Sequence, residues 1–231
     1  MMVWAHQQGL SPVVVVYCDT GWSSPSWPAR VRQMEEKARG FGFQTARSKS
    51  IGMAELVRIK KVWPGGLRQF CTAHLKSLPF LQLADEIDPK FEAVVMIGKR
   101  REESFKRANT PRLILNSDYH SGRTVWHPLY LHSEEERDKI LAAEGIEKLN
   151  HRSLECNPCI YANRADLLRL TKGEIERVNA LEVELSQPLF RAKQIGALGI
   201  HGALAWAREG RQRGNVEEEE HQCSGFFGCG L

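Results

Sequence analysis

The 231-residue sequence lacks any run of about 18 consecutive apolar residues, the length that a helix needs to cross a bilayer. It also lacks a basic opening segment of the kind that begins a signal peptide, and the apolar run Val13–Tyr17 is only long enough for a strand. No internal repeat is visible. These absences lead us to expect a cytoplasmic protein of one domain, or one domain with an appendage, and no membrane partner.

A large excess of charge is lacking too. The chain has 32 Lys and Arg against 28 Asp and Glu, which gives a net charge of +4 and a pI near 8.8. This mildly basic balance suits an anionic ligand such as a nucleotide, although an ordinary solvated surface explains it as well. Nucleic-acid binding remains possible but is not indicated by the charge.

Cysteine is present in a suggestive pattern. The stretch "SLECNPCI" at 153–160 places Cys156 and Cys159 three residues apart around Pro158, and Cys223 and Cys229 follow in the tail. Disulfides are rare in the cytoplasm, so these thiols point to metal binding or chemistry. Four thiolates suit a 4Fe–4S cluster or, as the alternative, a zinc ion. A redox dithiol and inert packing are the other interpretations, and His221 is a weaker candidate ligand.

Alternating apolar strands and amphipathic helices fill the first 130 residues and predict an α/β fold. The predicted strands are Val13–Tyr17 and residues 43–48, 91–98, 111–116 and 124–130. The predicted helices cover residues 1–8, 28–41, 52–63, 71–87 (bent or interrupted near Pro79) and 133–145. The last helix begins with a capping-box pattern, Ser133 with Glu136, and Gly145 is a plausible end.

We therefore expect a doubly wound, mostly parallel sheet with helices on both faces, plus a helical C-terminal region that carries cysteines. The predicted division is a nucleotide-binding α/β domain over 1–150 and a helical region with a cysteine cluster over 151–231. Helical stretches are expected near 163–171, 173–186 and 195–208. The tail after them ends in "CSGFFGCGL", which we expect to fold back onto the body because it is apolar.

Polar residues follow two predicted strands directly, at the sheet edge where open parallel sheets bind ligands. Asp19, Thr20, Gly21 and Trp22 follow the first strand, although a simple turn also explains this sequence. The "GKRREES" segment follows the strand at 91–98. Its Gly98 permits close approach of the backbone to a ligand, Arg100 can contact a phosphate or sulfate in bidentate fashion, and Glu103 can orient Arg100; a charged loop is the alternative.

A third basic group lies near the start of the helix at 71–87. Arg68, His74 and Lys76 cluster there, where free backbone N–H groups also favour anions. A phosphate or sulfate site and a solvated basic helix face are equally compatible with this pattern.

Five motifs occur in the order found in the phosphoadenosine phosphosulfate (PAPS) reductase family, which belongs to the PP-loop, adenine-nucleotide alpha-hydrolase-like superfamily. They are "VVVVYCDTGW", "LRQFCTAHLKSLP", "GKRREESFKRA", "WHPLY" and "SLECNPCI". The chain most resembles bacterial and phage-encoded members over residues 1–165.

The resemblance implies a doubly wound fold that binds an adenylylated nucleotide: PAPS, adenylylsulfate or ATP. It also implies a possible thioredoxin-like reductant as partner, and a homodimer is possible. The residues that it places at the nucleotide and its sulfate or phosphate groups are Asp19, Thr20, Gly21, Trp22, Arg68, His74, Lys76, Gly98, Arg100, Glu103 and Ser104.

The chain departs from the family pattern at two cysteine positions. Phe70-Cys71 stands where the adenylylsulfate reductase branch has two cysteines that join the later CxxC around a 4Fe–4S cluster. The family's C-terminal Glu-Cys-Gly-Leu-His is reduced to Gly228-Cys229-Gly230-Leu231. Two assignments remain. Either Cys156, Cys159, Cys223 and Cys229 hold the cluster, which we favour from the sequence, or Cys71 replaces Cys229, which then attacks the substrate sulfur as the catalytic nucleophile.

The family's Ser-Gly-Gly-x-Asp-Ser loop and the strand before it are not found ahead of the first helix. Since this loop is a main phosphate anchor, we expect weakened catalytic competence and an uncovered sheet edge. Three functions follow as hypotheses. The first is a PAPS reductase-like enzyme of sulfur metabolism or sulfur transfer. The second is an ATP-dependent protein that thiolates or modifies nucleic acid. The third is a truncated, non-catalytic nucleotide-binding module.

Overall fold

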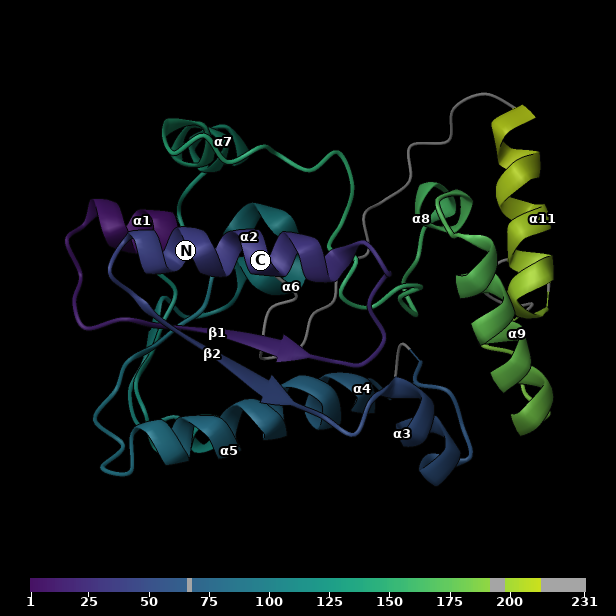
Figure 1. Ribbon diagram of the computed structural model, residues 1–231, viewed down its shortest axis with the longest axis horizontal. Coiled ribbons are helices and arrows are strands. Elements are labelled where there is room, and N and C mark those ends of the chain that lie inside the picture. Colours follow the sequence, from purple (N-terminus) through teal and green to yellow (C-terminus); the bar gives the residue numbers. More distant parts are fainter. Residues whose placement is uncertain (66–67, 192–197, 213–231) are drawn as a thin grey trace.

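The computed structural model describes residues 1–65, 68–191 and 198–212, and its centre is a pair of parallel strands. Strand β1 (Val14–Asp19) pairs with β2 (Gln44–Lys49), and Val14 lies opposite Gln44. Helices α1 (Met2–Gln7) and α2 (Trp27–Gly40) lie on one side of these strands, and α5 (Leu78–Ile87) lies on the other (Figure 1). The predicted α/β class with helices on both faces is confirmed.

A second, three-stranded sheet has the order β3–β5–β4. Strand β3 (Val95–Met96) is parallel to β5 (Val125–Trp126), and β4 (Leu113–Ile114) is antiparallel to β5. The sheets are thus mostly parallel, as predicted, with β4 as the antiparallel exception at one edge.

The strand predicted at 91–98 is much shorter than expected. The Asp88 carboxylate accepts hydrogen bonds from the backbone N–H groups of Glu92 and Ala93, both at 3.1 Å, which bends the chain into a turn. Phe91 has a φ of 59°, and 45% of its side chain is exposed. The apolar run therefore starts in a turn, and only Val95 and Met96 join the sheet.

Strand β1 is half-buried rather than fully buried, because only Tyr17 among its residues falls in the buried class. The continuous apolar run "VVVVY" predicted a strand covered on both faces. In the described part of the chain, β1 pairs only with β2, so its other edge has no strand partner.

The remaining elements follow local sequence signals closely. Ser133 Oγ accepts from the Glu136 N–H and the Glu136 carboxylate accepts from the Ser133 N–H, so the predicted capping box begins α7 (Glu134–Ala143). Gly145 follows its end with a φ of 63°. The other elements are α3 (Met53–Lys60), α4 (Phe70–Thr72), the π-helical η1 (Ala73–Ser77), the 3-10 turns η2 (Arg101–Glu103) and η3 (Asp118–His120), α6 (Phe105–Ala108), α8 (Arg164–Leu168), α9 (Lys172–Leu185) and α11 (Gly199–Gln212).

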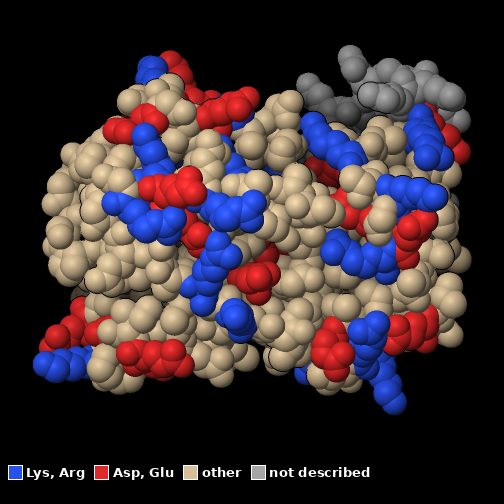
Figure 2. All heavy atoms as spheres, in the orientation of Figure 1, with Lys and Arg blue, Asp and Glu red and all other residues tan. Residues whose placement is uncertain are grey.

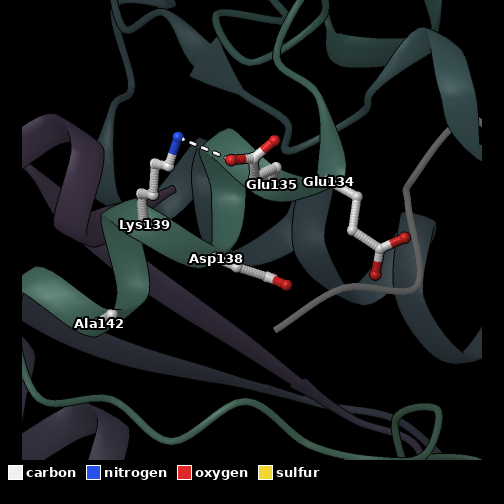
Figure 3. A pocket seen from close by; sticks show the side chains of 5 residues that line it. All are labelled: Glu134, Glu135, Asp138, Lys139 and Ala142. Atoms are coloured by element: carbon white, nitrogen blue, oxygen red, sulfur yellow. Dashed lines mark ion pairs between the residues drawn. The ribbon is translucent and has the colours of Figure 1, made fainter.

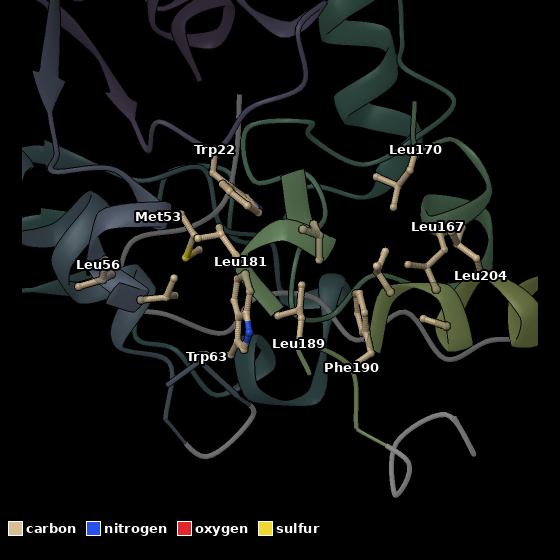
Figure 4. Close-up of a cluster of buried hydrophobic side chains, with 14 of the residues drawn as sticks. Trp22, Met53, Leu56, Trp63, Leu167, Leu170, Leu181, Leu189, Phe190 and Leu204 are labelled. Carbon is tan, nitrogen blue, oxygen red and sulfur yellow. The ribbon is translucent and has the colours of Figure 1, made fainter. Parts of the chain in front are cut away.

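The largest hydrophobic core joins early and late segments of the chain. Trp22, Met53 and Trp63 pack in one cluster with Leu181 of α9 and with Phe190 (Figure 4). The helical region after residue 163 therefore shares a core with the loop after β1. Helix α9 therefore packs against Trp22, one of the residues that the sequence predicts for the site. No helix within the described ranges is both long and apolar enough to cross a membrane.

Candidate nucleotide and cysteine site

The loop after β1 uses its polar groups to fix its own shape. Asp19 Oδ1 accepts the Gly21 N–H at 2.9 Å, and the Thr20 N–H and hydroxyl each donate to Glu155 Oε1 at 2.8 Å. Gly21 has a φ of +60°, and a Cβ there would lie 3.0 Å from the Cα of Gly52. The loop is therefore tightly specified, and its predicted contact with a nucleotide stays a prediction.

Trp22 supports this loop from inside the core. Its side chain is 1% exposed, and its indole N–H donates to the Pro158 carbonyl at 3.2 Å. The guanidinium of Arg177, on α9, lies over the ring at 4.0 Å. Trp22 thus contacts the cysteine loop from within, and any role toward a nucleotide would be indirect.

The cysteine loop lies alongside the loop after β1. Trp22 and Cys156 form a parallel bridge, and the Asn157 N–H donates to the Trp22 carbonyl at 2.9 Å. Helix α9 holds the same loop from its other side, because Asn157 donates to Glu174 at 2.7 Å and Arg177 donates to the Asn157 carbonyl at 2.6 Å. The CxxC is therefore clamped between the strand end and α9.

A π-helical turn brings Cys71 and Lys76 to the same side of their helix. These residues are five apart, and five residues of an α-helix would separate them by about 140° around the axis. The wider turn of η1 reduces this angle, as a π-turn closes its hydrogen bond at i+5. The predicted irregularity near Pro79 is thus a π-turn just before α5, and Pro79 occupies the first turn of that helix.

Three cysteines from distant parts of the chain line one small cavity of about 30 Å³. Cys71 comes from α4, whereas Cys156 and Cys159 come from the loop, and Lys76 is buried at the same cavity. Gln69 also lines it and donates to the Tyr161 hydroxyl. The other lining residues are Met53, Thr72 and Ile160. The structure thus brings Cys71 and Lys76 to the same cavity as the two cysteines of the CxxC.

The Cys156 thiol at this cavity is protonated near neutral pH when no metal is bound. Burial raises the pKa of Cys156 to about 11, and the nearby charge of Lys76 opposes that rise while Cys159 and Glu155 add to it. Burial also raises the pKa of Cys18, which lies on β1 within the field of Lys76. A metal would have to displace the proton from Cys156, so its binding would be strongly pH-dependent.

The chemistry of these donors fits a cysteine-ligated group, but the set is incomplete in the described chain. Three thiols line the cavity, and a 4Fe–4S cluster or a structural zinc site takes four ligands. Over the residues that the structure describes, no three His, Cys, Asp or Glu side chains are grouped closely enough to hold an ion. The predicted ligands Cys223 and Cys229, and the weaker candidate His221, lie outside the described residues.

The predicted anion-binding residues after β3 form a second group. Arg100 is 6% exposed, and its guanidinium Nε lies 3.7 Å from Glu103 Oε1. The backbone N–H of Arg100 donates to Glu103 Oε2 at 3.1 Å. Glu103 also pairs with Arg107, and Ser104 Oγ accepts the Arg107 N–H at the start of α6. Glu103 therefore contacts both arginines and Ser104 caps a helix, while the role of Glu103 in orienting Arg100 toward an anion stays a prediction.

Two histidines of this second group, His120 and His127, were missed from the sequence, and Lys99 was recognised only as part of the polar segment after the strand. Lys99, His120 and His127 are buried, and burial lowers the pKa of all three. Lys99 also lowers the pKa of both histidines, and for His120 the result is a pKa of about 4. His127 follows β5, the parallel neighbour of β3, so the "WHPLY" motif was the signal that could have found it. Both histidines are therefore neutral near pH 7, and the positive charge of this group comes from the buried Lys99, Arg100 and Arg107, which suits an anionic ligand.

The other predicted residues lie nearer the surface. Arg68 is exposed and its backbone pairs with Gly65, His74 is half-buried on η1, and Gly98 is exposed. A Cβ at Gly98 would lie 2.8 Å from the Met1 side chain, so the backbone approaches another group closely there, although that group is Met1.

A larger hollow of about 580 Å³ lies on the exposed side of α7 and contains none of the predicted site residues. Figure 3 shows its lining: Glu134, Glu135, Asp138, Lys139 and Ala142. Lys139 pairs with Glu135 at 2.8 Å, and both side chains are more than 70% exposed. One open helix surface of this kind gives a ligand little enclosure, so we assign the candidate site to the cysteine cavity and the strand ends.

Comparison with known proteins identifies the family of the chain. A search of curated proteins found no match. A crystal structure of phosphoadenylyl-sulfate (PAPS) reductase from Candida auris, in a phosphate complex, matches at 14% identity and a TM-score of 0.43; the match covers 63% of this chain and 66% of that one, less than two thirds of its length. The family model of the phosphoadenosine phosphosulfate reductase domain matches residues 2–179, and the chain therefore belongs to that family.

Proposed function

We propose that this chain is a PAPS reductase-like enzyme of sulfur metabolism or sulfur transfer that acts on an adenylylated sulfate nucleotide and carries a cysteine-ligated 4Fe–4S cluster. The observation that carries the proposal is the contact between the two predicted sites. Cys156, at the cysteine cavity, lies 3.8 Å from the hydroxyl of Thr20 at the end of β1. Nucleotide and cluster would thus be neighbours.

The second group supplies the expected chemistry for a sulfate or phosphate. Arg100 and Lys99 are buried at the carboxyl end of β3, where parallel sheets bind ligands. Arg100 Nη1 has no hydrogen-bond partner within the described residues, and its nearest carboxylate oxygen, on Glu102, is 3.5 Å away. A bidentate anion would complete the hydrogen bonding of this guanidinium.

The position of Cys71 supports the second of the two ligand assignments. Cys71, Cys156 and Cys159 line the same cavity, so Cys223 would complete a set of four. Cys229 would then be free to act as nucleophile. Its thiolate would attack the substrate sulfur, a sulfur–sulfur bond would form, and the nucleotide would leave with the electrons of the broken sulfur–oxygen bond. A thioredoxin-like dithiol would then release sulfite and become a disulfide.

We also propose a cellular compartment and an oligomeric state. We place the protein in the cytoplasm, where a reducing environment keeps the six cysteines as thiols or metal ligands. A homodimer would cover the edge of β1 that lacks a strand partner in the described chain, and exposed edges of this kind favour association.

Anaerobic purification followed by iron, sulfide and zinc analysis tests the cluster. Calorimetry with PAPS, adenylylsulfate, ATP and AMP tests the nucleotide site, and sulfite release with reduced thioredoxin tests turnover. Cys18→Ser is a matched control for Cys156→Ser, because Cys18 lies near Lys76 but does not line the cavity. We expect about four irons per chain in the parent and Cys18→Ser proteins, and much less in Cys156→Ser.

Other results would select the other functions. A protein without iron or zinc would overturn the cluster, and nucleotide binding without turnover would favour a non-catalytic module. Tight binding of tRNA or DNA with a steep salt dependence would favour nucleic-acid modification. On the face in Figure 2, basic and acidic side chains are interspersed, so this face offers no continuous basic surface for a nucleic acid.

A further inference from the structure

His127 is a buried side chain at the carboxyl end of β5, the central strand of the three-stranded sheet. The Ile97 N–H donates to the Trp126 carbonyl at 3.0 Å on the β3 side, and the His127 N–H donates to the Arg112 carbonyl at 2.8 Å on the β4 side. The side chain of His127 is 1% exposed. Backbone hydrogen bonds on both sides therefore fix this residue at the edge where open parallel sheets bind ligands.

One hydrogen bond sets the tautomer of this imidazole. Its Nδ1 lies 2.7 Å from the Pro111 carbonyl, and because a carbonyl oxygen only accepts, Nδ1 carries the proton. In the neutral ring Nε2 is then an acceptor. This atom is buried and has no hydrogen-bond partner within the described residues. Since a buried acceptor without a donor costs stability, the position indicates a ligand group that donates to Nε2.

Cationic donors lie beside this acceptor. Residues 97–101 run alongside residues 126–130, because backbone hydrogen bonds join the two segments at both ends. The first segment carries Lys99 and Arg100. Lys99 is close enough for its charge to lower the pKa of His127, and Arg100 Nη1 has no hydrogen-bond partner in the described part of the chain. The other charged or titratable groups around them are His120, Glu103, Arg107 and Arg123.

A ligand that satisfies these groups together needs several acceptors and one donor. A sulfate ester is fully ionised near neutral pH, so its oxygens only accept. A phosphate monoester has a second pKa of about 6, and its monoanion keeps a hydroxyl. That hydroxyl can donate to His127 Nε2 while the other oxygens accept from Lys99 and Arg100. Sites with a buried polar group reject an analogue that leaves this group unpaired.

We propose that His127 is a specificity-determining residue, whose Nε2 accepts a hydrogen bond from a phosphate hydroxyl and so selects a phosphate monoester over a sulfate at this group. The inference rests on the anion site of the proposed function and names the anion that binds there. PAPS carries such a group, its 3′-phosphate, which adenylylsulfate lacks. Free phosphate has the same chemistry and is the other source.

Calorimetry of the full chain with inorganic phosphate and with sulfate, at about pH 6.5 and 8, measures the preference. At pH 6.5, where phosphate is largely a monoanion, we expect it to bind several-fold more tightly than sulfate. The ratio of the two affinities should fall at pH 8 as phosphate loses its proton. The ratio is the criterion because any loss of charge from Lys99 weakens both anions. Equal affinities at pH 6.5, or no binding of phosphate, would overturn the inference.

His127→Phe should lower the phosphate-to-sulfate ratio at pH 6.5 several-fold, whereas His127→Gln should keep part of it, because an amide oxygen can replace Nε2 as acceptor. His151→Phe is the matched control, since His151 Nδ1 also lies 2.7 Å from a backbone carbonyl but precedes the CxxC. An unchanged ratio in His127→Phe overturns the inference. If this variant does not fold, the ratio in the parent and its change with pH still decide.

Proton uptake gives an independent criterion. Calorimetry in buffers of different ionisation enthalpy shows whether sulfate binding takes up a proton. Uptake in the parent that is lost in His127→Phe would mean that a protonated His127 donates to either anion, which contradicts the inference.

Competition with nucleotides identifies the source of the phosphate. If phosphate competes with PAPS but not with adenylylsulfate, the 3′-phosphate occupies this group; if it competes with neither, free phosphate is the ligand. Equal competition with both would mean that the group holds a part that the two nucleotides share, and would overturn the inference. A chain that prefers phosphate but binds neither nucleotide would refute the proposed function and leave the inference standing.

Discussion

The guanidinium of Arg177 lies 4.0 Å above the ring of Trp22, and the same guanidinium donates a 2.6 Å hydrogen bond to the Asn157 carbonyl. One side chain of α9 therefore contacts both the loop after β1 and the cysteine loop. Burial lowers the pKa of Arg177, so keeping its buried guanidinium charged costs free energy. The two contacts offset that cost. Helix α9 is thus a structural part of the site.

Replacing Arg177 with Met should destabilise the fold by about 2–3 kcal/mol, because a charged hydrogen bond and a cation–π contact are lost and a buried carbonyl loses its donor. Urea unfolding measures the change. Arg58→Met is the control, since Arg58 pairs with Glu184 at the surface and such exposed pairs add little stability. Equal losses of unfolding free energy in the two variants would contradict a stabilising role of the contacts that Arg177 makes.

Lys76 should tune the thiols at the cavity. Its charge lowers the pKa of Cys156 and of Cys18, so Lys76→Met should raise both and slow their alkylation several-fold at about pH 8.5. Lys60→Met, a change on the exposed end of α3, is the control. Alkylation of Cys156 at the parental rate in Lys76→Met would contradict the buried position of this ammonium group.

The helices were predictable because their signals are local. The Ser133–Glu136 capping box, Gly145 and the apolar spacing of α2 each lie within a few residues of the element they define. The strand at 91–98 was overestimated because the turn that shortens it depends on the Asp88 side chain, which periodicity does not detect. The half-burial of β1 depends on strand pairing, which is a property of the whole sheet.

The candidate site was only partly predictable for the same reason. The spacing of Cys156 and Cys159 indicated a pair of thiols, and Pro79 indicated an irregular helix, but nothing in the sequence showed that the π-turn there brings Cys71 and Lys76 to those thiols. Nothing in the sequence around Glu155 indicated its role, because its hydrogen-bond partners, Tyr17 and Thr20, lie more than 130 residues earlier. Contacts of this range come from tertiary structure alone.

Acid should destabilise the protein through His120. Burial lowers the pKa of this histidine from its ordinary 6.5 to about 4 in the fold. Between these values the unfolded chain binds a proton that the folded chain does not, so stability is full above about pH 6.5 and falls as the pH drops toward 4, by up to about 3 kcal/mol. Burial lowers the pKa of His127 as well, which adds a loss of the same sign.

Urea unfolding of His120→Asn at several pH values isolates this contribution from that of the carboxylates. Asn can still bond the Ser117 hydroxyl, which lies 2.9 Å from His120 Nδ1, but it does not titrate. The loss of stability between about pH 7 and 4.5 should be smaller in this variant than in the parent. His201→Asn, on the exposed face of α11, should keep the parental pH dependence.

Cys71 distinguishes the two ligand sets. If it completes a set with Cys156, Cys159 and Cys223, then Cys71→Ser should lower the iron content to less than about half of the parental value, since a 4Fe–4S cluster needs four protein ligands and serine is a poor one. Cys18→Ser should retain its iron, and Cys229→Ser should retain iron but lose turnover. The opposite pattern, with iron kept in Cys71→Ser and lost in Cys229→Ser, would assign the fourth thiolate to the tail and leave the chain without a free nucleophile there.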